Sequence, residues 1–204
     1  RNPLTSIKGF LKLMQSGYCM EKEYLDVMDS ELVRIEFILN ELLLLAKPTK
    51  QSFENKDINS VVLHVVKLLE TEANLKNILF KTEVHNDEIY INCDENQLKQ
   101  IFINFIKNGI EAMPTGGLMT ISTLLENDHV VIEIKDEGCG IPKEKLMNIG
   151  QPFFTTKEKG TGLGLAVSFS IVENHNGEIE IDSDEGQGTT IYVKLPLVHA
   201  KVVG

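Results

Sequence analysis

The sequence lacks three features that would each point to a particular class of protein: regularly spaced cysteines, a run of basic residues and a long apolar stretch. Its cysteines are Cys19, Cys93 and Cys139, which are odd in number, far apart and without the spacing of metal ligands. Scattered thiols of this kind are typical of a reducing cytoplasm. We therefore expect a cytoplasmic chain without a metal-thiolate site.

Positive charge is also scarce. Lysine and arginine together number 20 against 30 aspartates and glutamates, which gives a formal net charge of −10, and the basic residues form no cluster. Because nucleic acids and anionic membranes attract clustered positive charge, we expect no nucleic acid partner and no direct membrane contact. A signal peptide and a bilayer-spanning apolar stretch are not recognisable, which predicts a soluble chain.

The first 47 residues have the periodicity of a helical hairpin. Apolar residues recur there in alternating steps of three and four, interrupted around Ser16 and Gly17. The apolar positions are Leu4, Ile7, Leu11, Met14, Leu25, Met28, Leu32, Ile35, Leu39, Leu42 and Ala46. A single hairpin cannot bury this stripe, so two copies pairing into a four-helix bundle would make a homodimer through residues 1–47. Packing of the hairpin onto its own chain remains the alternative.

The remaining chain has the pattern of an α/β domain. Pro48 ends the second helix, because proline lacks a backbone donor, and residues 48–52 form a linker to a domain at residues 53–204. The pattern predicts helices at 58–73, 96–113 and 163–174, and strands at 78–84, 88–93, 118–125, 130–135, 178–182 and 189–195. Helices on one face of a mixed sheet form an α/β sandwich, so the fold class of the whole chain is α+β.

Two glycine-rich turns suggest a nucleotide site. Asp136 is followed closely by Gly138 and Gly140, so a carboxylate that accepts from an exocyclic amine stands beside backbone that a flat ring can approach. That combination suits adenine.

The second glycine-rich turn contains Gly160, Gly162 and Gly164 and leads into an apolar helix, whose first amides favour phosphate. Lys157 supplies a mobile positive charge beside it. Either turn alone is weak evidence, but their order along the chain is informative.

A third polar group lies upstream on the helix predicted at 96–113. Asn104, Asn108 and Glu111 are spaced at i, i+4 and i+7 and therefore share one face. Oxygen ligands on one face suit magnesium, whereas a merely solvated helix face is the ordinary alternative.

The order of these motifs closely resembles the ATP-binding domain of bacterial sensor histidine kinases, which share an ATPase superfamily with gyrase, Hsp90 and MutL. The resemblance covers nearly the whole chain. The matching segments are the N box at 104–112, the G1 box at 136–140, the F box at 152–157, the G2 box at 160–165 and the G3 turn at 185–189.

The resemblance implies ATP and Mg²⁺ as cofactors. It makes Asn108 the direct magnesium ligand with Asn104 in support, and Asp136 the acceptor of the adenine amine. Residues 153–157 would belong to a lid that folds over ATP. The implied nucleotide-binding residues are Asn104, Asn108, Asp136, Gly138, Gly140, Lys157, Gly160, Thr161, Gly162, Leu163, Gly164 and Thr189.

The resemblance also implies a phosphoacceptor histidine outside this chain. Histidine kinases keep it in an H box reading His-Glu-x-Arg-Asn-Pro, and this chain begins with Arg1, Asn2 and Pro3. The acceptor would lie three positions before Arg1, and Asn2 matches the position that can orient water for dephosphorylation of a response regulator. The five histidines present have structural or solvent roles in this interpretation; they are His64, His85, His129, His175 and His199.

The implied activity is transfer of the ATP γ-phosphoryl group to that histidine and then to an aspartate on the receiver domain of a response regulator. The wording of residues 1–10 and 152–167 resembles the sporulation sensor kinases of endospore-forming bacilli, sporulation kinase B foremost. This resemblance implies the cytoplasmic part of a membrane-anchored sensor and a small helical antikinase such as Sda as an inhibitor. An ATP-driven clamp, a catalytically dead scaffold and a serine kinase of the anti-sigma type are the alternatives.

Overall fold

The computed structural model describes residues 3–17, 22–46, 52–155, 157 and 160–198. The chain divides into two compact units, residues 1–49 and residues 50–204, and each is described by itself.

The first unit is a helical hairpin, as the periodicity predicts. Helix α1 (Pro3–Gln15) is followed by helix α2 (Lys22–Ala46), and the rings of Phe10 and Tyr24 lie 5.3 Å apart between the two helices. Leucines spaced one heptad apart on α2 stay about half exposed in the single chain: Leu25 at 49%, Leu32 at 49% and Leu39 at 53%. The hairpin by itself therefore leaves an apolar stripe in water, which is costly at about 25 cal/mol per Å² of apolar surface.

The second unit is built on a mixed five-stranded sheet with the strand order β2-β4-β5-β7-β6. Strands β2 and β4 are parallel, and the other neighbours are antiparallel. The strands are β2 (Ile78–Glu83), β4 (Gly117–Glu126), β5 (His129–Asp136), β6 (Glu178–Asp184) and β7 (Gly188–Pro196). A tight turn with Asn127 in the left-handed conformation (φ 52°) joins β4 to β5.

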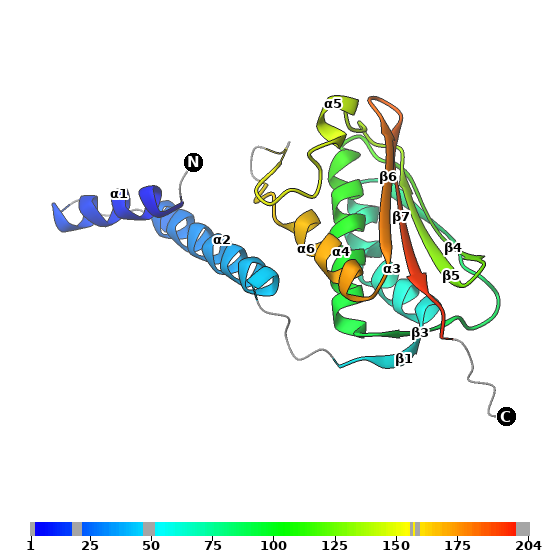
Figure 1. The fold of residues 1–204 in the computed structure, drawn as a ribbon. Coiled ribbons are helices and arrows are strands. Elements are labelled where there is room, and N and C mark those ends of the chain that lie inside the picture. The colour runs from blue at the N-terminus through cyan, green and yellow to red at the C-terminus, as the bar shows by residue number, and fades with distance from the viewer. Residues whose placement is uncertain (1–2, 18–21, 47–51, 156, 158–159, 199–204) are drawn as a thin grey trace. The chain divides into compact units, whose positions relative to one another are not determined.

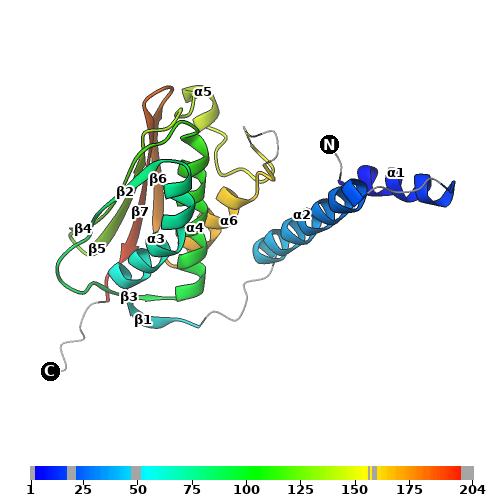
Figure 2. The same cartoon turned by 180° about the vertical axis from the view of Figure 1, so that it is seen from behind.

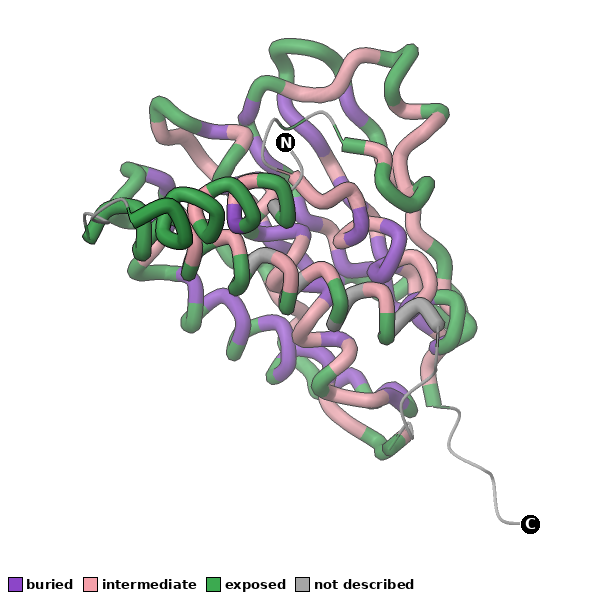
Figure 3. The backbone as a smooth tube through the Cα atoms, turned by 90° about the vertical axis from the view of Figure 1, so that its left-hand side faces the viewer, coloured by how far each residue is buried: buried purple, intermediate pink, exposed green. Residues whose placement is uncertain are grey.

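Three long helices cover one face of this sheet, as Figures 1 and 2 show. They are α3 (Ile58–Leu75), α4 (Glu95–Ala112) and α6 (Gly164–Asn174). Side chains such as Phe102, Phe105 and Ile106 of α4 are at most 1% exposed, and each buried side chain of this size contributes about 1.5–3 kcal/mol. In Figure 3 the buried segments (purple) run along these helices and strands. The expected α/β sandwich is confirmed.

The first turns of α3 and α4 are capped by aspartates that precede them. The carboxylate of Asp57 accepts from the amides of Asn59 and Ser60, and that of Asp94 accepts from the amides of Asn96 and Gln97. Each cap satisfies backbone donors that have no partner within the helix, which is worth about 1 kcal/mol.

Two elements were not predicted, and one predicted strand is shorter than expected. Strand β1 (Glu54–Asp57) pairs antiparallel with β3 (Tyr90–Cys93) in a separate two-stranded sheet, so the strand expected at 88–93 starts later and does not join the main sheet. The sequence of β1 has no apolar alternation that could reveal it. Helix α5 (Lys143–Leu146) is a single turn, too short for a periodic pattern.

Candidate functional site

The polar face of α4 is joined to the start of α6 by a chain of hydrogen bonds. The side-chain amide of Asn108 donates to Oδ1 of Asn104 at 3.3 Å, and that of Asn104 donates to Oγ of Ser168 at 2.9 Å. The Ser168 hydroxyl in turn donates to the carbonyl of Gly164 at 2.9 Å. The two motifs predicted separately on α4 and before α6 therefore meet in space.

Asp136 stands at the end of β5 and connects two glycine turns. Its Oδ1 accepts from the amide of Gly138 at 2.8 Å and from the amide of Thr189 at 3.3 Å, and the residue is only 7% exposed. Burial raises the pKa of the Asp136 carboxyl above its usual value, although the two amide hydrogen bonds act in the opposite direction. The expected G1 and G3 segments are thus held together by one carboxylate.

Gly140 lets the G1 turn pass directly against the end of β6. Its backbone has φ 65°, and a Cβ atom at this position would lie 2.0 Å from the carbonyl oxygen of Asp184. A side chain there is excluded both by this contact and by the left-handed conformation. The adjacent Cys139 is exposed, and its backbone bonds to Ala112 and Gly186 fasten the same turn.

The segment expected to form a lid begins and ends at residues that contact each other, Phe153 and Gly162. The amide of Phe153 donates to the carbonyl of Gly162 at 2.9 Å, and a Cβ on Gly162 would lie 2.4 Å from the Phe153 carbonyl carbon. Both residues have positive φ, 68° and 70°, which is unusual for phenylalanine. The Phe153 side chain is 65% exposed, so residues 153 and 154 do not form a buried aromatic pair. Thr156 lies outside the described residues.

Lys157 reaches from this segment to the polar face of α4. Its Nζ donates to Oδ1 of Asn108 at 2.6 Å and forms an ion pair with Glu111. A cation therefore already lies between the amide oxygen and the carboxylate that share this face. Sequence reasoning placed Glu111 on the correct face but did not anticipate its partner.

The remaining predicted residues surround the start of α6 and the G3 turn. Leu163 precedes the helix and is fully buried, so it offers its backbone rather than its side chain, and its amide donates to Oγ1 of Thr161 at 3.4 Å. The side chain of Leu163, the residue at the N-cap position, makes no capping hydrogen bond. The Thr189 hydroxyl lies 2.9 Å from Oγ of Ser183. Asn2 lies outside the described residues.

His175 has a structural role, as the sequence interpretation expected. It is 3% exposed at the end of α6, its Nδ1 lies 2.7 Å from the carbonyl of Ile171, and its ring packs against Phe53 at 4.8 Å. Burial lowers the pKa of the His175 imidazole below its ordinary value, against opposing effects of Ile171 and Asp94.

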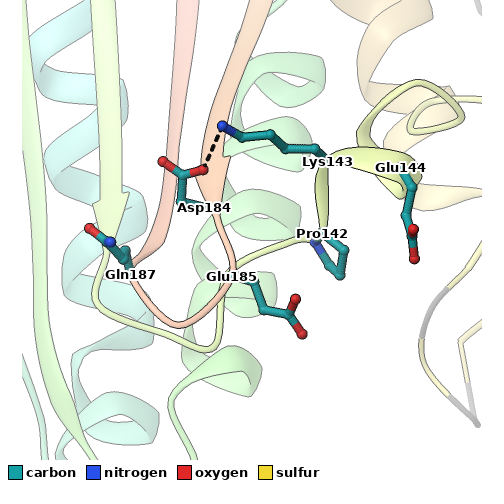
Figure 4. A pocket seen from close by; sticks show the side chains of 6 residues that line it. All are labelled: Pro142, Lys143, Glu144, Asp184, Glu185 and Gln187. Atoms are coloured by element: carbon teal, nitrogen blue, oxygen red, sulfur yellow. Dashed lines mark ion pairs between the residues drawn. The ribbon is translucent and has the colours of Figure 1, made fainter.

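An open hollow of about 540 Å³ lies next to these turns (Figure 4). Lys143 reaches across it to form an ion pair with Asp184 at 3.1 Å. Its lining is Pro142, Lys143, Glu144, Asp184, Glu185 and Gln187, which includes none of the predicted nucleotide-binding residues. We therefore assign the candidate site to α4, Asp136 and the lid segment.

The described part of the chain holds no group of three or more histidine, cysteine or acidic residues placed to bind a metal ion. Magnesium in proteins keeps several waters and binds through few protein oxygens together with phosphate. None of the described helices is both long and apolar enough to cross a membrane.

Two family models match the two units. Residues 93–199 match the family described as histidine kinase-, DNA gyrase B- and HSP90-like ATPase, and residues 1–51 match the His Kinase A (phospho-acceptor) domain. The chain belongs to the histidine kinase family. Its hairpin and its α/β sandwich are thus the two domains that these models describe.

This histidine kinase chain is similar to sporulation kinases of Bacillus subtilis (strain 168). It is 52% identical to sporulation kinase C over 97% of the chain and 46% of that kinase, and 52% identical to sporulation kinase A over 96% of the chain and 32% of that kinase. Sporulation kinase B is 35% identical. The expectation that kinase B is the most similar member is wrong, because its basis was motif wording that kinases of one family share. The chain spans less than half the length of these relatives.

Solved histidine kinases have the same architecture. Acinetobacter baumannii AdeS superposes with a TM-score of 0.79 at 22% identity, covering 98% of this chain and 97% of AdeS, which shows the fold. The histidine kinase ThkA, in complex with the response regulator protein TrrA, superposes with a TM-score of 0.78 at 30% identity over 96% of this chain and 58% of ThkA.

Proposed function

We propose that this histidine kinase core binds Mg-ATP between α4, the G1 turn and the start of α6, and that its parent protein phosphorylates a histidine. The observation that carries the proposal is the convergence of segments separated along the chain. Asn104 and Asn108 meet the start of α6 and Lys157, while Asp136 binds both flanking turns.

Asp136 is the proposed acceptor of the adenine amino group. Both of its backbone hydrogen bonds fall on Oδ1, which orients the carboxylate, and Oδ2 would accept from the adenine amine. Gly138 and Gly140 would shape the pocket, and Thr189 would line it. A buried carboxylate that is already oriented loses little further freedom when the ligand binds.

The polar face of α4 fits a magnesium ion carried by phosphate. Asn108 would be the direct ligand and Asn104 its support, because the Lys157 ammonium group already lies against the Asn108 oxygen and the Glu111 carboxylate. When bound, Mg²⁺ would offset the negative charge of the phosphates.

The start of α6 would supply the donors for those phosphates. Residues 160–164 lead into α6, whose N-cap residue Leu163 offers no side-chain cap, so the first amides of the helix can bind phosphate oxygen. Gly160, Thr161, Gly162, Leu163 and Gly164 would therefore contribute mainly main-chain groups.

The proposed chemistry moves one phosphoryl group. The bond from the γ-phosphorus to the bridging oxygen of ADP breaks as a bond to an imidazole nitrogen forms, and ADP leaves. The acceptor would lie three positions before Arg1, and Asn2 would orient water in the reverse, phosphatase direction. The match of residues 1–51 to a phospho-acceptor domain supports this assignment and disfavours a gyrase-type clamp.

The proposed partners follow from the hairpin and from the relatives. A homodimer through residues 1–47 would cover the half-exposed leucines of α2, and a response regulator would receive the phosphoryl group, as the ThkA complex with TrrA suggests. Similarity to sporulation kinases C and A supports a role in sporulation signalling. We further propose that the chain is the cytoplasmic part of a membrane-anchored sensor and that a small helical antikinase such as Sda docks on the hairpin.

The domain division is likewise proposed at residues 1–47, 48–52 and 53–204. Most of the linker lies outside the described residues.

The deciding experiment measures the intact mass of the protein, extended upstream through the whole H box, after incubation with Mg-ATP. An acid-labile gain of one phosphate, absent from the chain that starts at Arg1, is the expected result. Tight ATP binding without any gain would instead favour a dead scaffold or an ATPase.

A further inference from the structure

The ammonium group of Lys157 occupies the place where the proposed function puts the charge of the metal ion. Its Nζ lies 2.6 Å from Oδ1 of Asn108 and pairs with Oε2 of Glu111. Because like charges repel, the ammonium group and a metal ion would compete for this amide oxygen.

The backbone around Lys157 ties its side chain to the position of the lid. Its amide donates to Oγ1 of Thr155 at 3.1 Å, and its carbonyl accepts from the amide of Gly160 at 3.2 Å. Where this segment begins and ends, the amide of Phe153 donates a hydrogen bond to the carbonyl of Gly162. These bonds hold the described backbone at Lys157, while the flexible four-carbon stem of its side chain lets the ammonium group change partners.

The contact of Lys157 with Asn108 and Glu111 of α4 is weak enough for another cation to replace the ammonium group. The side chains of Lys157 and Glu111 are 41% and 52% exposed, and exposed ion pairs contribute little to stability. A divalent cation that arrives with phosphate ligands can therefore displace the ammonium group, which a deeply buried pair would resist.

We propose that Glu111 is a positioning residue for Lys157: together with Asn108 it holds the ammonium group, before nucleotide binds, as a stand-in for the metal. With Mg-nucleotide bound, Lys157 would leave Asn108 and Glu111, and its ammonium group would turn toward the phosphates. The Glu111 carboxylate would then have a cation nearby both before and after the nucleotide binds. This inference rests on the proposed binding of Mg-ATP at the same site.

The first test measures how fast the amine of Lys157 is acetylated in the nucleotide-free chain, read by mass spectrometry. Lys107 is the internal reference. It lies on α4, the helix that carries Glu111, and it pairs with Glu72 at 4.0 Å, with side-chain exposures similar to those of the Lys157–Glu111 pair. Glu111→Gln should raise acetylation of Lys157 several-fold and leave Lys107 unchanged. Glu72→Gln, the matched control, should leave Lys157 unchanged. Equal acetylation of Lys157 in the wild type and in Glu111→Gln overturns the proposal.

The second test measures the binding of a fluorescent ADP analogue, mant-ADP, across a Mg²⁺ titration at constant ionic strength. Lys157→Met should lower the Mg²⁺ concentration needed for half-maximal tightening several-fold, whereas Lys107→Met should not. An unchanged or higher requirement in Lys157→Met overturns the exchange of cations. A wild type that binds no mant-ADP at any Mg²⁺ concentration refutes the proposed function instead, and the acetylation result, which needs no nucleotide, tells the two failures apart.

Discussion

Nε2 of His175 accepts a hydrogen bond from the backbone amide of Asp94 at 3.0 Å, which ties the end of α6 to the beginning of α4. The Asp94 carboxylate also accepts from the amide of Ser52, at the end of the proposed linker. Helices α4 and α6 are therefore joined at two places, by His175 here and by Asn104 and Ser168 at the site.

This geometry predicts a loss of stability in weak acid. Since Nε2 is an acceptor, the neutral form with its proton on Nδ1 fits the fold, and the folded-state pKa lies below the unfolded value of about 6.5. The contribution of His175 is complete above that unfolded pKa and declines as the pH falls below it, because the unfolded chain takes up the proton first.

Urea denaturation at pH 8 and pH 5.5 checks this. The wild type should lose more free energy of unfolding between the two values than His175→Asn does. His64→Gln, which changes an exposed histidine, should keep the wild-type difference. Identical pH dependence of stability in all three proteins would exclude His175 as the cause of the loss of stability in weak acid.

Asp136→Asn should weaken ADP binding about 5- to 150-fold while the domain stays folded. The amide keeps an oxygen for Gly138 and Thr189, but its other atom is a donor that faces the donating amine of adenine, a mismatch worth about 1–3 kcal/mol. Titration calorimetry with ADP measures the effect. Asp184→Asn, at the neighbouring hollow, is the control, and equal losses in both variants would refute the assignment of Asp136.

Thr123→Val should destabilise the domain by about 1–3 kcal/mol without changing ADP affinity. The buried Thr123 hydroxyl donates to Oδ1 of Asn59 and accepts from the amide of His85, both at 2.8 Å, and valine leaves these groups unpaired. Thr123→Ser keeps the hydroxyl and should cost less, about 1 kcal/mol for the lost methyl group. Thermal or urea unfolding of the two variants measures this difference in stability. A serine variant as unstable as the valine variant would contradict the hydrogen-bond explanation.

Replacing Leu25, Leu32 and Leu39 of α2 by glutamine should convert the expected dimer to a monomer. These leucines are about half exposed in the single chain, so their contribution would come from a partner hairpin. Sedimentation velocity at several concentrations measures the change. The matched control replaces Leu63, Leu68 and Leu75 of α3, which are exposed in the other unit, and a wild type that is already monomeric would overturn the expectation.

Much of the fold was predictable because it depends on local periodicity. The hairpin, α3, α4 and α6 have long apolar repeats, and the strands of the main sheet alternate or are bounded by turn residues. Strand β1 escaped prediction because the residues Glu54–Asp57 are polar, and their pairing with β3 is a contact between distant segments.

The sequence by itself determined which chemical groups are available: Asp136 between turns, Asn104, Asn108 and Glu111 on one helix face, and Lys157 in a polar loop. Spacing along one helix is a local property, so that face could be read directly. Only the tertiary structure decided which of these groups touch. The ion pair of Lys157 with Glu111 and the bond from Asp94 to His175 join residues far apart in the chain. Such contacts depend on how the helices pack on the sheet, which no local pattern encodes.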